Sequence, residues 1–121
     1  LQASKDDHIV PFESVFRTAK LYGGEANFVL SGSGHIAGVV NHPDAKKYQH
    51  WTNPGKLGAS AAEWLESATE TGGSWWPTWW DWLKPKSGRK INAPAPKDMG
   101  LGAAPGTYAK VRIADIRLPP A

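Results

Sequence analysis

The sequence predicts an α/β fold, because a loop, a helix and a strand follow one another within its first forty residues. Residues 4–11 have the composition of a loop that follows a strand, and apolar residues recur at helical spacing over 12–22. Residues 27–30 are aromatic and β-branched, as in a buried strand. A glycine-rich segment with one histidine, 31–38, ends that strand. This alternation is typical of an open α/β sheet.

Length and composition limit the classes of protein to which the chain can belong. Its 121 residues suffice for one small domain or part of one. The absence of cysteine excludes disulfides, thiolate metal sites and a cysteine nucleophile within these residues. Leu1 is not a methionine, and the sequence has neither a signal peptide nor an apolar run of membrane-spanning length. We therefore expect a soluble, cytoplasmic protein whose upstream part is missing.

Charge and tryptophan are unevenly distributed. Residues 1–80 carry 6 basic and 8 acidic side chains, whereas 81–121 carry 8 basic and 3 acidic ones. A basic tail is either solvated or contacts phosphate groups of nucleic acid, of an anionic surface or of coenzyme A. Seven tryptophans are many for so short a chain, and five of them lie between residues 75 and 82.

The first helix is predicted over residues 12–22. Pro11 suits a helical first turn, where its missing N–H has no intrahelical acceptor anyway. Gly23 and Gly24 end the helix. The apolar positions at helical spacing are Phe12, Val15, Phe16, Ala19 and Leu21 or Tyr22.

The loops on either side of this helix–strand unit hold the candidate catalytic residues. Carboxyl ends of parallel strands meet at one edge of a sheet, so Asp7 and His35 are expected to meet there. Their separation of 28 residues holds one helix and one strand, which suits a carboxylate that orients an imidazole from the neighbouring strand. Asp6 is an alternative to Asp7, and either carboxylate could instead serve the N–H groups of the helix N-terminus.

His35 has the chemistry of a general base, since an imidazole takes up and returns a proton near neutral pH. Glycines at 32, 34 and 38 allow positive φ and the close approach of another group. A loop histidine that is satisfied by a backbone hydrogen bond is the simpler interpretation, and the residues by themselves leave both open.

The other histidines show no metal-binding pattern. Residues 39–60 are rich in proline and glycine and are predicted to be a loop, in which His42 and His50 lack convincing metal partners. His8 is interpreted as structural, because the two apolar residues after it place it at the edge of a packed turn.

Two further helices are predicted. Ser60 with Glu63 forms a capping box that begins a short helix. Pro77 opens a second helix, with one apolar face formed by Trp76, Trp79, Trp80 and Leu83. This face packs against another part of a larger protein, or it is a platform for sugars or single-stranded nucleic acid, or an interfacial anchor.

We expect three regions within one domain. Residues 1–41 form the core loop, helix and strand with the aspartate and histidine, and 42–83 form a loop and the Trp-rich helices. Residues 84–121 form a basic tail rich in proline and glycine. Within the tail, 108–113 is predicted to be a short strand, and the tail wraps over a larger body or is loose.

Five motifs in order across nearly the whole chain resemble the C-terminal end of polyhydroxyalkanoate synthases, most like the class I poly(3-hydroxybutyrate) polymerases. They are Asp7-His-Ile-Val-Pro, Phe28-Val-Leu-Ser-Gly-Ser-Gly-His-Ile-Ala-Gly-Val-Val-Asn, His50-Trp-Thr-Asn, Gly73-Ser-Trp-Trp-Pro and Ala104-Pro-Gly-Thr-Tyr. The chain departs from the family at His42, where proline is common, and at Phe12, where tryptophan is common. These departures concern fine substrate preference.

The resemblance implies the C-terminal part of an α/β-hydrolase fold, with the last helix and strand of its core sheet. It further implies a cysteine, histidine and aspartate triad that joins (R)-3-hydroxyacyl groups from coenzyme A thioesters into polyester. Asp7 matches the triad aspartate and His35 the triad histidine. The cysteine lies upstream in such enzymes, so this chain alone is expected to be inactive. No cofactor or metal is expected.

The family further implies a cytoplasmic enzyme, a homodimer at full length, that is associated with polyester granules. No nucleic-acid partner and no transmembrane segment are expected. Two alternatives remain: a segment of a serine lipase or esterase of the same fold, and a non-catalytic Trp-rich module that binds surfaces. The isolated chain is expected to be marginally stable, because its helix and strand normally pack on further strands of a sheet.

Overall fold

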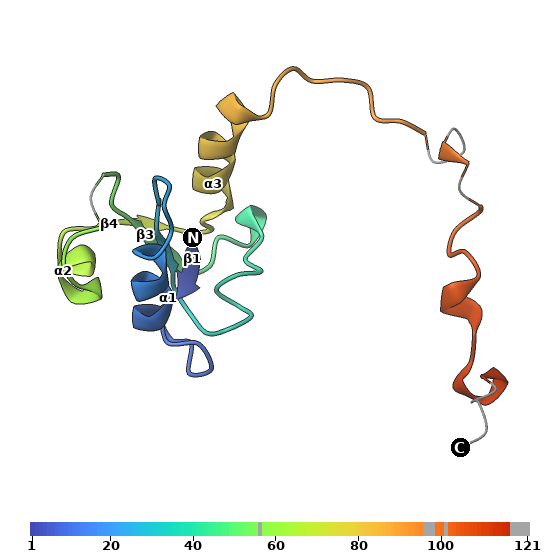
Figure 1. The fold of residues 1–121 in the computed structure, drawn as a ribbon, viewed down its shortest axis with the longest axis horizontal. Coiled ribbons are helices and arrows are strands. Elements are labelled where there is room, and N and C mark those ends of the chain that lie inside the picture. Colours follow the sequence, from blue (N-terminus) through green and yellow to red (C-terminus); the bar gives the residue numbers. More distant parts are fainter. Residues whose placement is uncertain (56, 96–98, 101, 117–121) are drawn as a thin grey trace. The chain divides into compact units, whose positions relative to one another are not determined.

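The computed structural model describes residues 1–55, 57–95, 99–100 and 102–116. The chain contains two compact units, Leu1–Gly88 and Arg89–Ala121 (Figure 1). The strands and α-helices of the described residues belong to the first unit. No helix within the described ranges is long and apolar enough to cross a membrane.

A mixed sheet forms the centre of the first unit. Strands β1 and β2 are parallel, while β3 pairs antiparallel with β2, and β4 antiparallel with β3. In sheet order, the strands are β1 (Gln2–Ser4), β2 (Val29–Ser31), β3 (Gln49–Thr52) and β4 (Thr69–Gly72). The predicted α/β class is therefore confirmed, although only one strand pair is parallel among the described residues.

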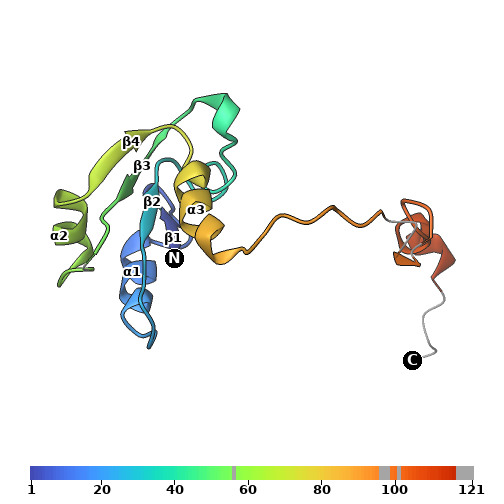
Figure 2. The same ribbon diagram turned by 90° about the horizontal axis from the view of Figure 1, so that it is seen from above.

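The helices lie on opposite faces of this sheet (Figure 2). Helices α1 (Phe12–Ala19) and α2 (Ala61–Glu66) cover the face formed by Ala3, Leu30 and Trp51, three residues that are paired in register across β1, β2 and β3. Helix α3 (Trp76–Leu83) lies on the other face, which presents mainly polar side chains. Alternation of side chains along each strand separates the two faces.

Three aromatic rings form the centre of the core. The Phe28 ring stands edge-on to Phe16, with centroids 5.4 Å apart, and to Trp64, at 4.9 Å. All three are buried. Edge-to-face packing adds attraction to the hydrophobic gain, so these rings hold α1 and α2 against the sheet.

The first helix begins where the sequence predicts and ends earlier. Its N-terminal boundary is Pro11, and its last residue is Ala19, with a helical Lys20 as the C-cap. Leu21 and Tyr22 are exposed. The buried face of the helix ends at Ala19. A further helical turn would therefore bury neither Leu21 nor Tyr22 against the core. The predicted strand is likewise confirmed but shifted to Val29–Ser31.

The predicted start of α2 is confirmed. The Ser60 hydroxyl accepts from the Glu63 N–H at 3.2 Å, and the Glu63 carboxylate accepts from the Ala59 N–H at 3.2 Å. The carboxylate thus reaches one residue further back than in the usual capping box, which returns to the N-cap residue itself.

Two predictions of local structure are wrong. Residues 39–60 are not loop throughout, because β3 (Gln49–Thr52) runs through them with His50 and Trp51 buried. The predicted strand over 108–113 is replaced by 3-10 turns at Tyr108–Lys110 and Ile113–Asp115. A strand forms where a partner edge is available. β3 lies between two partners, whereas 108–113 has none within the described residues.

Candidate active site

The loops after β1 and β2 lie side by side because the two strands are parallel. The ladder continues beyond the strands, where the Lys5 N–H donates to the Ser31 carbonyl at 2.8 Å and the Asp6 N–H donates to the Ser33 carbonyl at 3.1 Å. These bonds bring the acidic loop against the glycine-rich loop. The two loops therefore lie together at the carboxyl edge of the sheet, as predicted.

Asp7 and His35 are in direct contact. His35 Nδ1 lies 2.7 Å from Asp7 Oδ2, while Asp7 Oδ1 accepts from the N–H groups of Ile9 and Val10 at 2.9 Å each. Both carboxylate oxygens thus have donors. Asp6, the alternative candidate, is exposed and makes no side-chain hydrogen bond among the described residues.

The Asp7 carboxylate serves a turn rather than the helix N-terminus. Its N–H donors, Ile9 and Val10, precede Pro11, which is the N-cap of α1. The alternative of a helix-capping aspartate is therefore wrong, although the carboxylate does accept backbone N–H groups as that alternative required.

The Val10 N–H is the main reason why the pKa of Asp7 lies below its ordinary value. Burial of the carboxylate opposes the effect, and the bonds from His35 and Ile9 add to it. Hydrogen bonds to an ionised carboxylate favour the charged form. Asp7 is therefore a carboxylate anion at neutral pH.

An ionised Asp7 defines which nitrogen of His35 is free. A carboxylate only accepts, so Nδ1 carries the proton in the 2.7 Å bond and Nε2 has a lone pair in the neutral ring. The His35 side chain is 45% exposed, whereas that of Asp7 is 7% exposed. Nε2 has no hydrogen-bond partner in the described part of the chain. This arrangement suits a general base that receives a proton from a group outside this chain.

In the glycine-rich loop, the residue with positive φ is not one of the glycines for which the sequence predicted it. Positive φ occurs at Ser33, at 73°, and at none of Gly32, Gly34 and Gly38. The predicted close approach is found at Gly38, where an added Cβ would lie 2.6 Å from both the Gly32 carbonyl oxygen and the Ser4 hydroxyl. Gly38 thus lets the His35 loop fold onto the polar face of the sheet.

His50 has a structural role that the sequence did not reveal. It is buried on β3, with Nδ1 3.2 Å from the Gly73 carbonyl oxygen and Nε2 2.9 Å from the Thr78 hydroxyl. The histidine therefore ties β3 to the beginning of α3. The sequence signals were the family motif that begins at His50 and an aromatic run too short to distinguish a strand from a loop, and neither indicated the contacts of the ring.

The remaining histidines have minor roles. His42 Nδ1 accepts from the Asp44 N–H at 3.2 Å and so caps the short 3-10 helix Pro43–Ala45. His8 is exposed, without a side-chain hydrogen bond among the described residues, so the packed-turn interpretation has no support. Within the same residues, no cluster of three or more His, Asp or Glu side chains could hold a metal ion.

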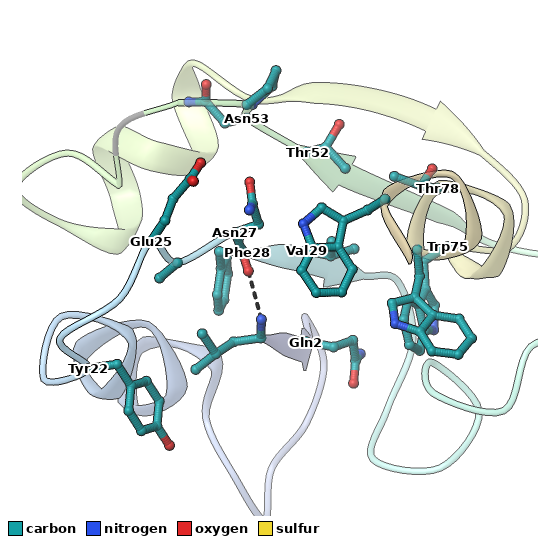
Figure 3. Close-up of a pocket in the computed structure, with 15 residues that line it drawn as sticks. Gln2, Tyr22, Glu25, Asn27, Phe28, Val29, Thr52, Asn53, Trp75 and Thr78 are labelled. Atoms are coloured by element: carbon teal, nitrogen blue, oxygen red, sulfur yellow. Dashed lines mark hydrogen bonds between the residues drawn. The ribbon is translucent and has the colours of Figure 1, made fainter. Parts of the chain in front are cut away.

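A cavity of about 640 Å³ lies between α3 and the polar face of the sheet (Figure 3). The tryptophans that line it are Trp75, Trp79 and Trp82, so this side of α3 differs from the apolar face that was predicted. Trp80 lies outside the lining and is 50% exposed. The sheet contributes Gln2, Val29 and Thr52 to the cavity.

Comparison with known proteins gives close relatives of a single kind. The chain is 48% identical over 113 residues to the poly(3-hydroxyalkanoate) polymerase subunit PhaC of Rhizobium etli, which is 91% of this chain and 18% of the relative. The protein of the same name from Rhizobium meliloti is 47% identical over 114 residues, 91% of this chain and 18% of the relative.

A third relative is more distant in sequence and equally well covered. The poly(3-hydroxyalkanoate) polymerase subunit PhaC of Cupriavidus necator is 41% identical over 116 residues, which is 93% of this chain and 20% of the relative. The chain thus spans about a fifth of the length of the relatives that it matches. No protein-family model matches it.

Proposed function

We propose that the larger enzyme joins (R)-3-hydroxyacyl groups from coenzyme A thioesters into polyester, since this chain is homologous to a segment of the poly(3-hydroxyalkanoate) polymerases. The chain supplies the histidine and the aspartate of a catalytic triad. The observation that carries the proposal is the 2.7 Å contact between His35 and Asp7 at the ends of two parallel strands. The proposed chemistry is acyl transfer that needs neither cofactor nor metal.

The first half-reaction forms an acyl-enzyme. The nucleophile is a cysteine thiol from another segment of the enzyme, because this chain has no cysteine. His35 Nε2 takes the thiol proton, and the thiolate attacks the carbonyl carbon of the thioester. The bond to the coenzyme A sulfur then breaks, and the departing thiolate takes the proton from the imidazolium. The segment alone is therefore inactive.

The second half-reaction extends the polyester. His35 Nε2 takes the proton of the 3-hydroxyl group of an incoming unit, and the hydroxyl oxygen attacks the carbonyl carbon of the acyl-enzyme. An ester bond forms, and the cysteine sulfur leaves and recovers a proton from His35. Asp7 fixes the Nδ1–H tautomer throughout and stabilises the imidazolium that forms in each step.

The sheet is proposed to be the end of an α/β-hydrolase fold. β1 is an edge strand among the described residues, and the residues that flank it bond to β2 through the Leu1 carbonyl and the Lys5 N–H. Alternation along the strand turns the backbone groups of Gln2 to the outer edge, where a further parallel strand of the larger enzyme would pair. The order of aspartate, helix, strand and histidine supports this placement.

The test is substitution of the dyad in the full-length polymerase. His35→Ala and Asp7→Ala should lower release of coenzyme A from 3-hydroxybutyryl-CoA by about 10³-fold or more, because removal of one triad member disables the unit. His8→Ala and Asp6→Asn are matched controls from the same loop and should keep activity within about twofold. Near-normal turnover by the His35→Ala enzyme contradicts the proposal.

The proposal includes a homodimeric, cytoplasmic enzyme at the surface of polyester granules. Support for the granule surface alone comes from α3, where Trp79, Trp80 and Trp82 are each about half exposed and Lys86 Nζ lies 5.1 Å from the Trp82 ring centre. Half-exposed indoles beside cations suit an interface between apolar material and water. Loss of binding to polyester particles after Trp80→Ala, with turnover of soluble substrate kept, is the expected result.

A further inference from the structure

Two adjacent tryptophans hold a single backbone carbonyl in the loop that carries His35. Nε1 of Trp76 donates to the Val39 carbonyl oxygen at 2.9 Å, and Nε1 of Trp75 donates to the same oxygen at 3.2 Å. A carbonyl oxygen has two lone pairs, so the two indoles satisfy it completely. Both indoles are partly buried, so the rings also have defined surroundings.

Val39 belongs to a compact turn that begins directly at the candidate base. The Gly38 N–H donates to the Gly34 carbonyl at 3.0 Å, and the N–H groups of Val39 and Val40 donate to the Ile36 carbonyl at 3.1 and 2.8 Å. These bonds make residues 34–40 one rigid unit. Fixing the Val39 carbonyl therefore fixes the turn from which His35 reaches Asp7.

The indoles are themselves anchored to the sheet. The Trp76 N–H donates to the buried Ser74 hydroxyl at 3.1 Å, and the Trp76 ring stands edge-on to His42 at 5.8 Å. Two residues further along α3, Thr78 meets His50 of β3 at 2.9 Å. A continuous chain of contacts thus leads from β3 through the start of α3 to the Val39 carbonyl.

We infer that Trp75 and Trp76 are positioning residues for His35, acting through the Val39 carbonyl, an inference that rests on the proposed function of His35 as the base. Asp7 orients the imidazole from one side, and the two indoles hold the backbone that carries it. Proton transfer between His35 and a nucleophile from another segment requires their atoms to be placed within a fraction of an ångström, so loosening this turn lowers the rate of chemistry.

The test replaces the indole N–H while it keeps an aromatic ring. Trp75→Phe and Trp76→Phe each leave the Val39 carbonyl one donor, so each single variant should lower kcat of the full-length polymerase by about threefold at most. The double variant leaves the oxygen without a donor. Its kcat should fall by about tenfold or more while KM for 3-hydroxybutyryl-CoA stays within about twofold.

Trp79→Phe is the matched control for amide exchange only, since Trp79 belongs to the proposed granule surface; its indole lies on the same helix and makes no hydrogen bond to the turn within the described residues. Hydrogen exchange gives a readout independent of activity. The exchange rates of the Val39 and Val40 amides should rise in the double variant and should equal the wild-type rates in the control. If the double variant does not fold, the Trp76→Phe variant is tested instead, and its Val39 and Val40 amides should exchange faster than those of the wild type.

Two outcomes separate the inference from the proposed function. If His35→Ala abolishes turnover but the double variant keeps wild-type kcat and amide exchange, the positioning role is wrong and the base assignment stands. If His35→Ala retains turnover, the proposed function is wrong. A double variant that loses activity only in proportion to loss of folded enzyme, with kcat per folded molecule unchanged, also overturns the positioning role.

Discussion

Gly38 is a residue at which the loop of His35 packs closely against the end of the sheet. An added Cβ would lie 2.6 Å from the Gly32 carbonyl oxygen, and the buried hydroxyls of Ser4 and Ser31 would be 2.6 and 2.9 Å away. Because these atoms belong to the backbone and to buried side chains, they cannot move away from an added Cβ without a cost in free energy. Gly38→Ala should therefore lower the free energy of unfolding of the full-length protein by about 1–3 kcal/mol, measured by urea denaturation.

The same loop provides a matched control for this prediction. An added Cβ at Gly34 would meet only the Asp6 carbonyl oxygen, at 3.7 Å, which is an ordinary contact. Gly34→Ala should change the free energy of unfolding by no more than about 0.5 kcal/mol. Equal effects of the two substitutions would mean that the close packing of Gly38 is not what the loop requires.

Asp7 should make stability depend on acid pH. Its pKa in the folded protein lies below the ordinary value, which is about 3.9 for an unfolded chain. The ionised carboxylate therefore stabilises the fold at pH values above the unfolded pKa, and this stabilisation is lost as the pH falls through the folded pKa. The difference in Tm between wild type and Asp7→Asn should shrink on acidification below about pH 4. A constant difference from pH 3 to pH 7 would contradict this account.

The dyad itself was predictable because it depends on chain order alone. A carboxylate after one strand and an imidazole after the next come together whenever the two strands are parallel neighbours, as β1 and β2 are. Chain order does not distinguish Asp7 from Asp6, and only the family resemblance favoured Asp7, because the choice depends on the turn whose N–H groups of Ile9 and Val10 hold one carboxylate oxygen.

At the scale of elements, local signals predicted α1, β2 and the start of α2, whereas pairing signals were absent for β3 and β4. Proline, periodic apolar residues and the Ser60 cap act within a few residues of each other. β4 has the polar sequence Thr69–Gly72 and is exposed, so only its partner β3 makes it a strand. Such elements follow from the tertiary fold, and composition near them indicates only a loop.

His50 links two of these elements and should be essential to their arrangement. His50→Ala leaves the Gly73 carbonyl and the Thr78 hydroxyl without their partner and opens space in a buried site. The free energy of unfolding should fall by about 2 kcal/mol or more, as judged by urea denaturation. The exposed His8→Ala is the control and should cost less than about 0.5 kcal/mol. A fully stable His50→Ala protein would mean that α3 is held by other contacts.

At the scale of the whole molecule, the first unit exposes more large hydrophobic residues than it buries. Eight hydrophobic residues form its core, three of them alanines, while eleven large hydrophobic residues of the same unit are exposed. The exposed set includes Ile9 and Ile36, close in sequence to the dyad, and three tryptophans of α3. In the proposed larger enzyme, the remaining segments would cover the exposed aliphatic side chains, whereas the α3 tryptophans face the polyester surface.

The isolated 121-residue chain should consequently be marginally stable. An edge strand of three residues and a core of this size leave little free energy to offset the entropy of ordering the chain. Its thermal unfolding, followed by circular dichroism, should be broad, and a dye that binds apolar surface should fluoresce strongly with it at 25 °C. The full-length protein should bind the dye more weakly, because its remaining segments cover the edge of β1 and the exposed aliphatic side chains. A sharp, cooperative transition of the isolated chain with weak dye binding would instead mean that the first unit folds stably without further segments.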